Sequence, residues 1–341
     1  MDTVNQAAED LKGDTVSLSI VVPLHNEEPN LEYLFARLES VLTSLKLRYE
    51  IVCVDDGSKD NTLMYLIQHH HRNPAIKVVS LSRNFGKEIA LTAGIDYASG
   101  AAVVPIDADL QDPPELIKEL VGRWHEGFDV VYATRRSRQG ESWLKRFTAN
   151  AFYRVISSIS SVPIPRNTGD FRLLDRRVVE ILKRMPERTR FMKGLFAWVG
   201  FHQISIVYDR SPRYKGKTKW NYWRLWNFAV DGITSFTLVP LKIWGYVGLV
   251  LSLFAFLYAA FLMIRTLIFG IVVPGYASLM VVTLFLGGMQ LLTLGIIGEY
   301  LGRVYEEVKR RPLYLVRDCY GFATNYQRND QSKLVDGRTA K

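Results

Sequence analysis

Three side chains with hard oxygen donors follow one apolar segment near the middle of the sequence. Asp107, Asp109 and Gln111 come directly after the apolar run 101–106, which is typical of a buried strand. Residues two positions apart on an extended chain point the same way, so we expect these side chains to share one face. Carboxylate and amide oxygens are ligands that Mg²⁺ and Mn²⁺ prefer. The spacing therefore indicates a divalent metal site at the carboxyl end of this strand.

The same segment has a plainer interpretation as a connection between a strand and a helix. Pro113 and Pro114 suit the first turn of a helix that we expect to run to about Glu126. Asp112 would then cap that helix, and the carboxylates before it would belong to a solvated loop. An isolated Asp-x-Asp pattern favours this interpretation, so the metal hypothesis depends on the segments before and after it.

A second acidic stretch follows an earlier apolar segment. Residues 49–54 are expected to form a buried strand, and Asp55-Asp56-Gly57-Ser58 comes directly after them. In doubly wound folds an acid at this place accepts hydrogen bonds from a ribose or a base. The alternative is an Asx-type turn with Gly57 in the left-handed region. The residues alone support the two interpretations equally.

Two further stretches combine charged and small residues. Asp170 lies between Gly169 and Phe171, with Arg172 two positions away, which fits either a residue at a reacting centre or a structural Asp–Arg pair. The loop 213–219 is basic and contains a glycine, so its cations are suited to binding phosphates. The alternative for this loop is a positive flank of a membrane segment that binds no ligand.

The elements that must position these residues alternate along the chain. Apolar runs of strand length, separated by segments of helical pattern, lie at 17–24, 49–54, 76–81, 101–106 and 129–133. This alternation predicts an α/β fold with a mostly parallel sheet. Ligands of such sheets bind at the carboxyl ends of the strands, where the acidic stretches lie. The sequence contains neither Gly-x-Gly-x-x-Gly after the first strand nor a P-loop pattern, which counts against nicotinamide enzymes and P-loop NTPases.

Two long apolar runs follow these segments. The runs 243–264 and 276–297 each have about 22 residues, or roughly 33 Å of helix, which is enough to cross a bilayer. Lysine and arginine residues gather before the first run and after the second, so both ends of this hairpin are predicted to be cytoplasmic. We therefore expect a catalytic domain over 1–222, an interfacial amphipathic helix over 223–240, the hairpin within 241–300 and a cytoplasmic tail over 301–341.

The charge of the chain is unevenly distributed. The formal net charge is +9, and the stretch 134–220 holds 20 lysine and arginine residues against 6 aspartate and glutamate residues. A basic belt beside a membrane hairpin indicates anionic lipid or phosphate partners, and no nucleic-acid-binding motif accompanies it. The two cysteines, Cys53 and Cys319, form no disulfide framework and agree with a reducing compartment.

Taken together, these motifs resemble one family, the polyprenyl-phosphate glycosyltransferases of the GtrB type. This family is related to the dolichol-phosphate mannose synthases and has an inverting GT-A catalytic domain, which is a Rossmann-like α/β fold. The segments that carry the resemblance are 22–27 (VPLHNE), 55–58 (DDGS), 107–115 (DADLQDPPE), 169–172 (GDFR) and 213–219 (RYKGKTK). The apolar hairpin most resembles that of the bactoprenol glucosyltransferases. One departure is His25, where the family usually has a tyrosine.

The resemblance implies a role for each matching residue. The donor nucleotide would be bound by Pro23, His25, Glu27, Val54, Asp56 and Lys87. A Mg²⁺ or Mn²⁺ ion would be held by Asp107, Asp109 and Gln111, with the last two as the preferred direct ligands. Donor or acceptor phosphates would be faced by Arg135, Arg213 and Lys219, and the catalytic residues would be Asp170, Asp107 and Arg172.

The resemblance also implies a reaction, which is transfer of a hexose from a nucleotide sugar to undecaprenyl phosphate with inversion. UDP-glucose is the first expectation for the donor, with GDP-mannose and a UDP-aminopentose as alternatives. A lipid phosphate with a second pKa of about 6 is largely ionised at neutral pH, so no strong general base is needed. We therefore expect Asp170 to position a substrate or to stabilise positive charge on the sugar.

The expected setting is the bacterial plasma membrane, with a homo-oligomer, a tetramer being one candidate. A processive polysaccharide synthase is an alternative, but it usually carries Gln-x-x-Arg-Trp and more spans, which this sequence lacks. A non-catalytic membrane scaffold is a third hypothesis, and the intact set of carboxylates argues against it.

Overall fold

The computed structural model describes residues 16–136, 168–185, 187–188, 190, 192–209, 239–269 and 275–322. The chain divides into two compact units. The first unit contains Met1–Tyr153, Pro163–Asn221 and Pro312–Lys341, and the second contains Arg154–Val162 and Tyr222–Arg311. The chain therefore leaves the first unit before the apolar helices and returns to it after them.

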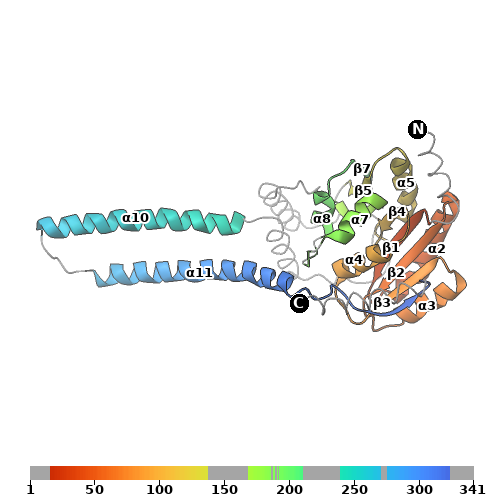
Figure 1. The fold of residues 1–341 in the computed structure, drawn as a ribbon, viewed down its shortest axis with the longest axis horizontal. Helices are drawn as coiled ribbons and strands as arrows, with labels where there is room; N and C mark the ends of the chain where they lie inside the picture. Colours follow the sequence, from red (N-terminus) through yellow and green to blue (C-terminus); the bar gives the residue numbers. More distant parts are fainter. Residues whose placement is uncertain are drawn as a thin grey trace, which may run out of the picture. The chain divides into compact units, whose positions relative to one another are not determined.

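The described part of the first unit is built on one eight-stranded sheet, in the order β7-β5-β6-β4-β1-β2-β3-β8 (Figure 1). Its strands are β1 (Leu18–Leu24), β2 (Tyr49–Asp55), β3 (Ile76–Leu81), β4 (Ala102–Pro105), β5 (Val130–Arg135), β6 (Thr168–Asp175), β7 (Gln203–Tyr208) and β8 (Val316–Tyr320). Strands β1 to β4 are mutually parallel, as predicted. Strand β6 is antiparallel to β4 and β5, and β8 is antiparallel to β3, so the sheet is mixed.

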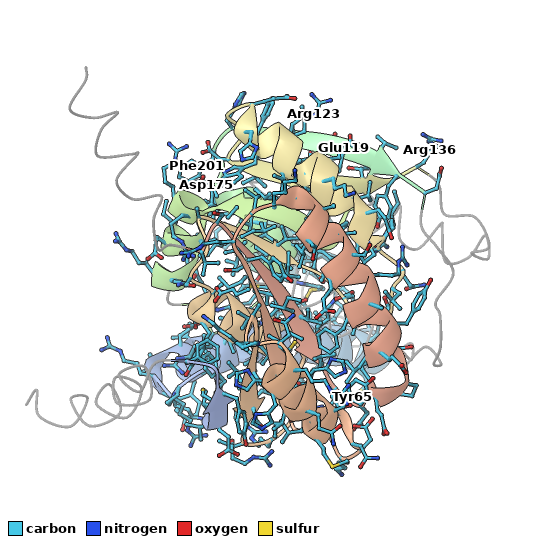
Figure 2. The ribbon with its side chains drawn as sticks, turned by 90° about the vertical axis from the view of Figure 1, so that its right-hand side faces the viewer. Tyr65, Glu119, Arg123, Arg136, Asp175 and Phe201 are labelled. Carbon is cyan, nitrogen blue, oxygen red and sulfur yellow. The ribbon has the colours of Figure 1, made fainter. Side chains whose placement is uncertain are left out.

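Helices cover both faces of this sheet (Figures 1 and 2). They are α2 (Glu28–Leu45), α3 (Thr62–Arg72), α4 (Lys87–Tyr97), the short 3₁₀ helix η1 (Pro114–Leu116), α5 (Ile117–His125), α7 (Arg176–Arg184) and α8 (Met192–Trp198). Alternate side chains of β1 point to the two layers: Ile20 belongs to the buried core that includes Leu34 and Phe35 of α2, whereas Val21 lies against α4 at Gly94. Because both faces are covered, the central strands are almost continuously apolar, which explains why the sequence revealed them.

The second unit contains two long helices, α10 (Val239–Phe269) and α11 (Tyr276–Val308), which contact each other. Both are longer than the predicted apolar runs 243–264 and 276–297. Helix α11 continues past the apolar run through a charged segment, where Arg303 pairs with Glu299 one turn away at 2.8 Å. Within the described residues, Ser278–Val308 is long and apolar enough to cross a membrane, and the apolar stretch Tyr246–Tyr258 is shorter.

The segment after α11 differs from the predicted charged tail. Residues Val316–Tyr320 form β8, which pairs with β3 at the edge of the sheet. The structure therefore makes part of the predicted tail 301–341 a strand of the first unit. The predicted interfacial helix 223–240 falls almost entirely outside the described residues, as does the tail beyond residue 322.

Candidate active site

The loops that follow β1, β2 and β3 are held together by Asp56. Its buried carboxylate accepts hydrogen bonds from the backbone N–H of Phe85 at 2.7 Å and of Gly86 at 2.9 Å, both in the loop after β3. The ring nitrogen Nδ1 of His25, after β1, lies 2.9 Å from the Asp56 carbonyl oxygen. The structure thus brings His25 and Asp56 together, as the nucleotide-site hypothesis requires.

The acidic stretch after β2 also forms the predicted turn. The Asp55 carboxylate accepts a hydrogen bond from the Ser58 N–H at 3.2 Å, and Gly57 has a φ of +63°. A Cβ atom on Gly57 would lie 2.6 Å from the carbonyl carbon of Arg83, so the β2 and β3 loops pack backbone to backbone here. The predicted turn, with Gly57 in the left-handed region, is therefore present and Asp55 takes part in it, while the nucleotide-binding role of Asp56 stays a prediction.

Lys87 joins two carboxylates that come from distant parts of the chain. Its Nζ lies 2.8 Å from Oδ2 of Asp107, after β4, and 2.6 Å from Oδ2 of Asp170, on β6. The second oxygen of Asp170, Oδ1, is buried and has no hydrogen-bond partner among the described residues. Buried polar atoms are nearly always paired, so this oxygen marks a position where a ligand could bind. Lys87, predicted for the nucleotide pocket, lies in the structure between two predicted catalytic residues.

The electrostatic environment keeps Asp170 ionised. Burial alone would raise the pKa of Asp170, but Lys87 and Lys193 hold it well below its usual value. For the neighbouring Glu88, burial dominates: burial and the nearby Asp170 charge together raise its pKa to about 7. Asp170 is therefore a permanent anion at neutral pH, which suits it to stabilise positive charge and makes it a poor proton acceptor.

Arg172 lies beside Asp170 on β6 but binds elsewhere. Its Nη2 donates to the carbonyl oxygen of Gly169 at 2.8 Å, and its guanidinium lies 4.1 Å from the ring centroid of Phe196. Burial lowers the pKa of Arg172 to about 10, an effect that the Asp170 charge partly offsets. These contacts indicate a side chain that supports β6, with its charge reaching Asp170 through space.

A second cluster, which the sequence did not reveal, contains Asp112, Arg135 and Tyr208. The Tyr208 hydroxyl donates to the buried Asp112 carboxylate, and Arg135 Nε donates to the Tyr208 oxygen at 3.2 Å. The plainer interpretation, in which Asp112 caps the following helix, is wrong, because its carboxylate is bound by Tyr208 and Pro113 precedes η1. Burial and Asp112 raise the pKa of Tyr208 to about 12, so it remains a hydrogen-bond donor at neutral pH.

This second cluster lies against the start of β6. A Cβ atom on Gly169 would approach Arg135 Nη2 to 3.0 Å, so a side chain at position 169 would crowd the guanidinium. The same Nη2 is 3.8 Å from Oδ1 of Asp112. The glycine before Asp170 therefore leaves room for Arg135, the described member of the predicted phosphate-binding set.

The segment Asp107–Gln111 is a turn and not the extended end of a strand, which corrects the geometry assumed from the sequence. Strand β4 ends at Pro105, Leu110 has a φ of +58°, and Asp109 Oδ1 accepts a hydrogen bond from the Gln111 N–H at 3.2 Å. An aspartate that bonds to the backbone two residues on stabilises a turn in preference to a strand. The alternation of side chains along a strand therefore cannot place Asp107, Asp109 and Gln111 on one face, as was assumed from the sequence.

The chemistry of these donors fits a divalent ion all the same. In the described part of the chain, no group of three or more His, Cys, Asp or Glu side chains is arranged to hold a metal. A magnesium ion in a nucleotide site commonly takes one or two protein carboxylates and completes its shell with substrate phosphates and water. The Asp107 side chain is 27% exposed, and both of its oxygens contact Lys87 Nζ, so a metal ion there would share the carboxylate with this lysine.

The other residues predicted to bind the nucleotide or phosphates differ in their exposure and contacts. Pro23 is half-buried near the end of β1, and Glu27 accepts a hydrogen bond from the Asn30 side chain at 2.8 Å. Val54 is completely buried, and its side chain packs under α4, where a Cβ on Gly94 would meet it at 3.1 Å. The Val54 side chain therefore belongs to the core under α4 and is not open to a ligand. Arg213 and Lys219 lie outside the described residues.

Comparison with known proteins decides which family this site belongs to. Residues 19–182 match the profile of glycosyl transferase family 2, and residues 239–304 match the GtrB C-terminal hairpin. The chain is 67% identical over 307 residues to an uncharacterized glycosyltransferase of Synechocystis sp., covering 90% of this chain and 96% of that relative. This chain is a family 2 glycosyltransferase of the GtrB type.

Other members of family 2 with more specific names are also similar. A bactoprenol glucosyl transferase of Shigella flexneri, derived from prophage SfII, is 46% identical over 305 residues, covering 89% of this chain and 99% of the relative. Among solved structures, the mannosyl-3-phosphoglycerate synthase of Rubrobacter xylanophilus is 19% identical with a TM-score of 0.45, covering 66% of this chain and 73% of that chain. A likeness as distant as the latter transfers no residue role.

Proposed function

We propose that this family 2 glycosyltransferase transfers a single hexose from UDP-glucose to a polyprenyl phosphate, with inversion at the sugar carbon. The observation that carries the proposal is the Lys87–Asp107–Asp170 cluster, in which one buried carboxylate oxygen has no hydrogen-bond partner among the residues described. The relatives named as bactoprenol glucosyl transferases, which match over almost their whole length, support the class of acceptor and of sugar.

The proposed reaction is a single displacement. An oxygen of the acceptor phosphate forms a bond to the sugar carbon while the bond from that carbon to the donor diphosphate breaks. UDP leaves with the electron pair, and no proton must be removed, because the acceptor phosphate is already ionised at neutral pH. Attack opposite the leaving group inverts the configuration.

Each cluster then has a defined task. The ionised Asp170 stabilises positive charge that develops on the sugar, and its low pKa keeps it from accepting a proton. Arg135, held by Tyr208 and Asp112, supplies positive charge for a phosphate. Asp107, Asp109 and Gln111 would hold Mg²⁺ or Mn²⁺, which, when bound, neutralises charge on the leaving diphosphate.

The path of the chain supports two membrane crossings. Strand β3 precedes α10 and α11, β8 follows them, and the two strands pair in one sheet. This pairing supports a path in which the chain is on the same side before and after the helices, which favours two crossings over a single crossing by α11. Both helices expose large apolar side chains, such as Leu267 at 82% and Leu291 at 72%, as lipid-facing helices do.

The positive charges flanking the hairpin favour the cytoplasmic side of the bacterial plasma membrane for the first unit and both termini. We extend the proposal to a homo-oligomer, for which a tetramer is the candidate, with membrane lipids as further partners.

A donor panel tests the proposal. Purified full-length protein, undecaprenyl phosphate and Mg²⁺ or Mn²⁺ are incubated with UDP-glucose, GDP-mannose or a UDP-aminopentose, and the lipid-linked product is measured. We expect transfer from UDP-glucose to exceed that from the other donors. Preferred transfer from another donor would revise the sugar, whereas products with several sugars would favour a processive synthase.

A further inference from the structure

The segment that returns from the apolar helices contacts the loops of the candidate donor site. Strand β8 runs along the edge of the sheet beside β3, and it is drawn in dark blue in Figure 1. The pairing is Ser80 with Asp318 and Leu81 with Val316, so Arg317 is an extra residue in β8. A bulge of this kind re-aims a side chain, and bulges are common next to active sites.

The bulge directs Arg317 to the β2 loop through one intermediate residue. Arg317 Nη2 donates to the hydroxyl of Ser80 at 2.9 Å, and this hydroxyl donates to Oδ2 of Asp55 at 3.4 Å. Asp55 and Ser80 are both completely buried. The other oxygen of Asp55 holds the turn at Ser58, so the cation at the edge of the sheet supports a buried carboxylate that shapes the donor site.

The same segment holds the start of the β3–α4 connection and the far end of α4. The N–H of Ser82, at the start of this connection, donates to the carbonyl oxygen of Leu315 at 2.8 Å. The Tyr314 hydroxyl donates to Asp96 near the end of α4 at 2.9 Å. Between these contacts lie the Phe85 and Gly86 amides that bind Asp56, followed by Lys87.

We infer that residues 314–317 are a positioning element of the donor site, with Arg317 acting on the β2 and β3 loops through Ser80 and Asp55. The inference rests on the proposed function for its kinetic consequence and on the contacts alone for its structural one. Arg317 touches no reacting atom in this scheme. It fixes the loops that carry Asp56 and Lys87, so its loss weakens donor binding more than it slows the chemical step.

Three variants of the full-length protein separate positioning from general stability. Arg317→Ala removes the contact, and Arg317→Lys keeps a cation that can still donate to Ser80. Arg123→Ala is the matched control, because Arg123 is similarly exposed, lies on the outer side of α5 (Figure 2) and pairs only with the nearby Glu126 among the contacts described. Three measurements are made: backbone hydrogen exchange over 82–87, the midpoint of thermal unfolding, and the KM values for donor and acceptor.

We expect Arg317→Ala to speed exchange of the 82–87 amides and to raise the donor KM about fivefold, which corresponds to about 1 kcal/mol, the typical net contribution of one hydrogen bond. The acceptor KM and kcat should stay within about twofold, the unfolding midpoint should match Arg123→Ala, and Arg317→Lys should recover most of the donor KM. Unchanged exchange over 82–87 in Arg317→Ala, or equal effects in Arg123→Ala, would overturn the inference.

The exchange measurement needs no turnover, so it separates this inference from the proposed function. If the wild-type protein transferred no sugar while exchange over 82–87 still accelerated in Arg317→Ala, the function would fail and the positioning element would stand. If transfer occurred and Arg317→Ala changed neither exchange nor the donor KM, the positioning element alone would fail.

Discussion

Lys87 Nζ lies 2.6 Å from Oδ2 of Asp170, while Oδ1 of the same carboxylate is buried without a hydrogen-bond partner in the part of the chain that the structure describes. One oxygen is thus neutralised by a cation of the protein, and the other is left for a substrate. Lys87 also binds Asp107, so a single lysine connects the segment after β4 with the antiparallel strand β6.

Asp170→Asn is expected to lower kcat about 100-fold or more, with the donor dissociation constant changed by less than about threefold. The amide keeps the shape of the side chain and removes the charge that stabilises the developing positive sugar. The measurement is kcat from pH 6 to pH 9 together with equilibrium binding of the donor nucleotide. Recovery of the rate at high pH would show that Asp170 works as a general base and would contradict the assignment.

Lys87→Met is expected to destabilise the protein by about 1–3 kcal/mol at pH 7, less than for a fully buried pair because the lysine side chain is partly exposed. In the wild type, burial raises the pKa of Asp170 but Lys87 lowers it further, so the net pKa is depressed. The resulting stabilisation is present above the unfolded pKa of about 4 and is lost as pH falls through the folded pKa.

The deficit of Lys87→Met should nevertheless shrink as pH is lowered from 7 toward 4, because the variant's buried carboxylates have lost their cation, burial raises their pKa, and they take up protons in this range while the wild type does not. Thermal unfolding of wild type and variant across this range gives the measurement. Lys118→Met, on the exposed side of α5, is the control and should be nearly neutral throughout. A deficit that does not change with pH would show that Lys87 acts through packing and not through the carboxylates.

Asp109→Ala is expected to reduce turnover at least about 100-fold in saturating Mg²⁺ or Mn²⁺. The reason is that Asp107 and Gln111 alone would not hold the ion where it neutralises charge on the leaving diphosphate. The fold should be intact, since Asp109 lies in a turn after β4. Circular dichroism and turnover are compared with Glu119→Ala, which removes an acid on α5 (Figure 2). Near-normal turnover in Asp109→Ala would remove Asp109 from the metal site.

Lys219→Ala is expected to cut transfer at least about tenfold, with insertion and orientation unchanged, if its charge clamps a phosphate within hydrogen-bond reach. This prediction comes from the sequence, because Lys219 lies outside the described residues. Lys215→Ala is the matched control, since topology depends on the sum of many positive charges and any one of them is replaceable. Equal, small losses in both variants would mean that the loop is only a membrane flank.

The sequence predicted the centre of the sheet well. Strands β1 to β4 are buried on both faces, so each is an apolar run that stands out without knowledge of its partners. Strand β6 was missed because it carries Asp170 and Arg172 in its middle, and these buried charges interrupt the apolar pattern. Their pairing with distant groups is what makes such a strand possible, and periodicity does not record it.

Long-range contacts explain the other differences. The plainer interpretation made Asp112 a helix cap, but its partner Tyr208 is 96 residues away in sequence. The partner of Ser80 in β8 is 237 residues away, and β8 carries charged residues as an exposed edge strand does. Motif resemblance placed Asp107, Asp170 and Lys87 among the candidate site residues, but only the fold shows that one lysine bridges the two carboxylates.

The most direct test of the central claim is release of UDP from UDP-glucose by the full-length protein with and without undecaprenyl phosphate, followed by mass and anomeric analysis of the lipid. The account predicts that release depends on the lipid phosphate, that the product carries one hexose, and that its anomeric configuration is opposite to the donor's. The Asp170→Asn variant should bind UDP and release almost none from UDP-glucose. Release of UDP that is independent of lipid phosphate, or a product that retains the donor configuration, would contradict the account.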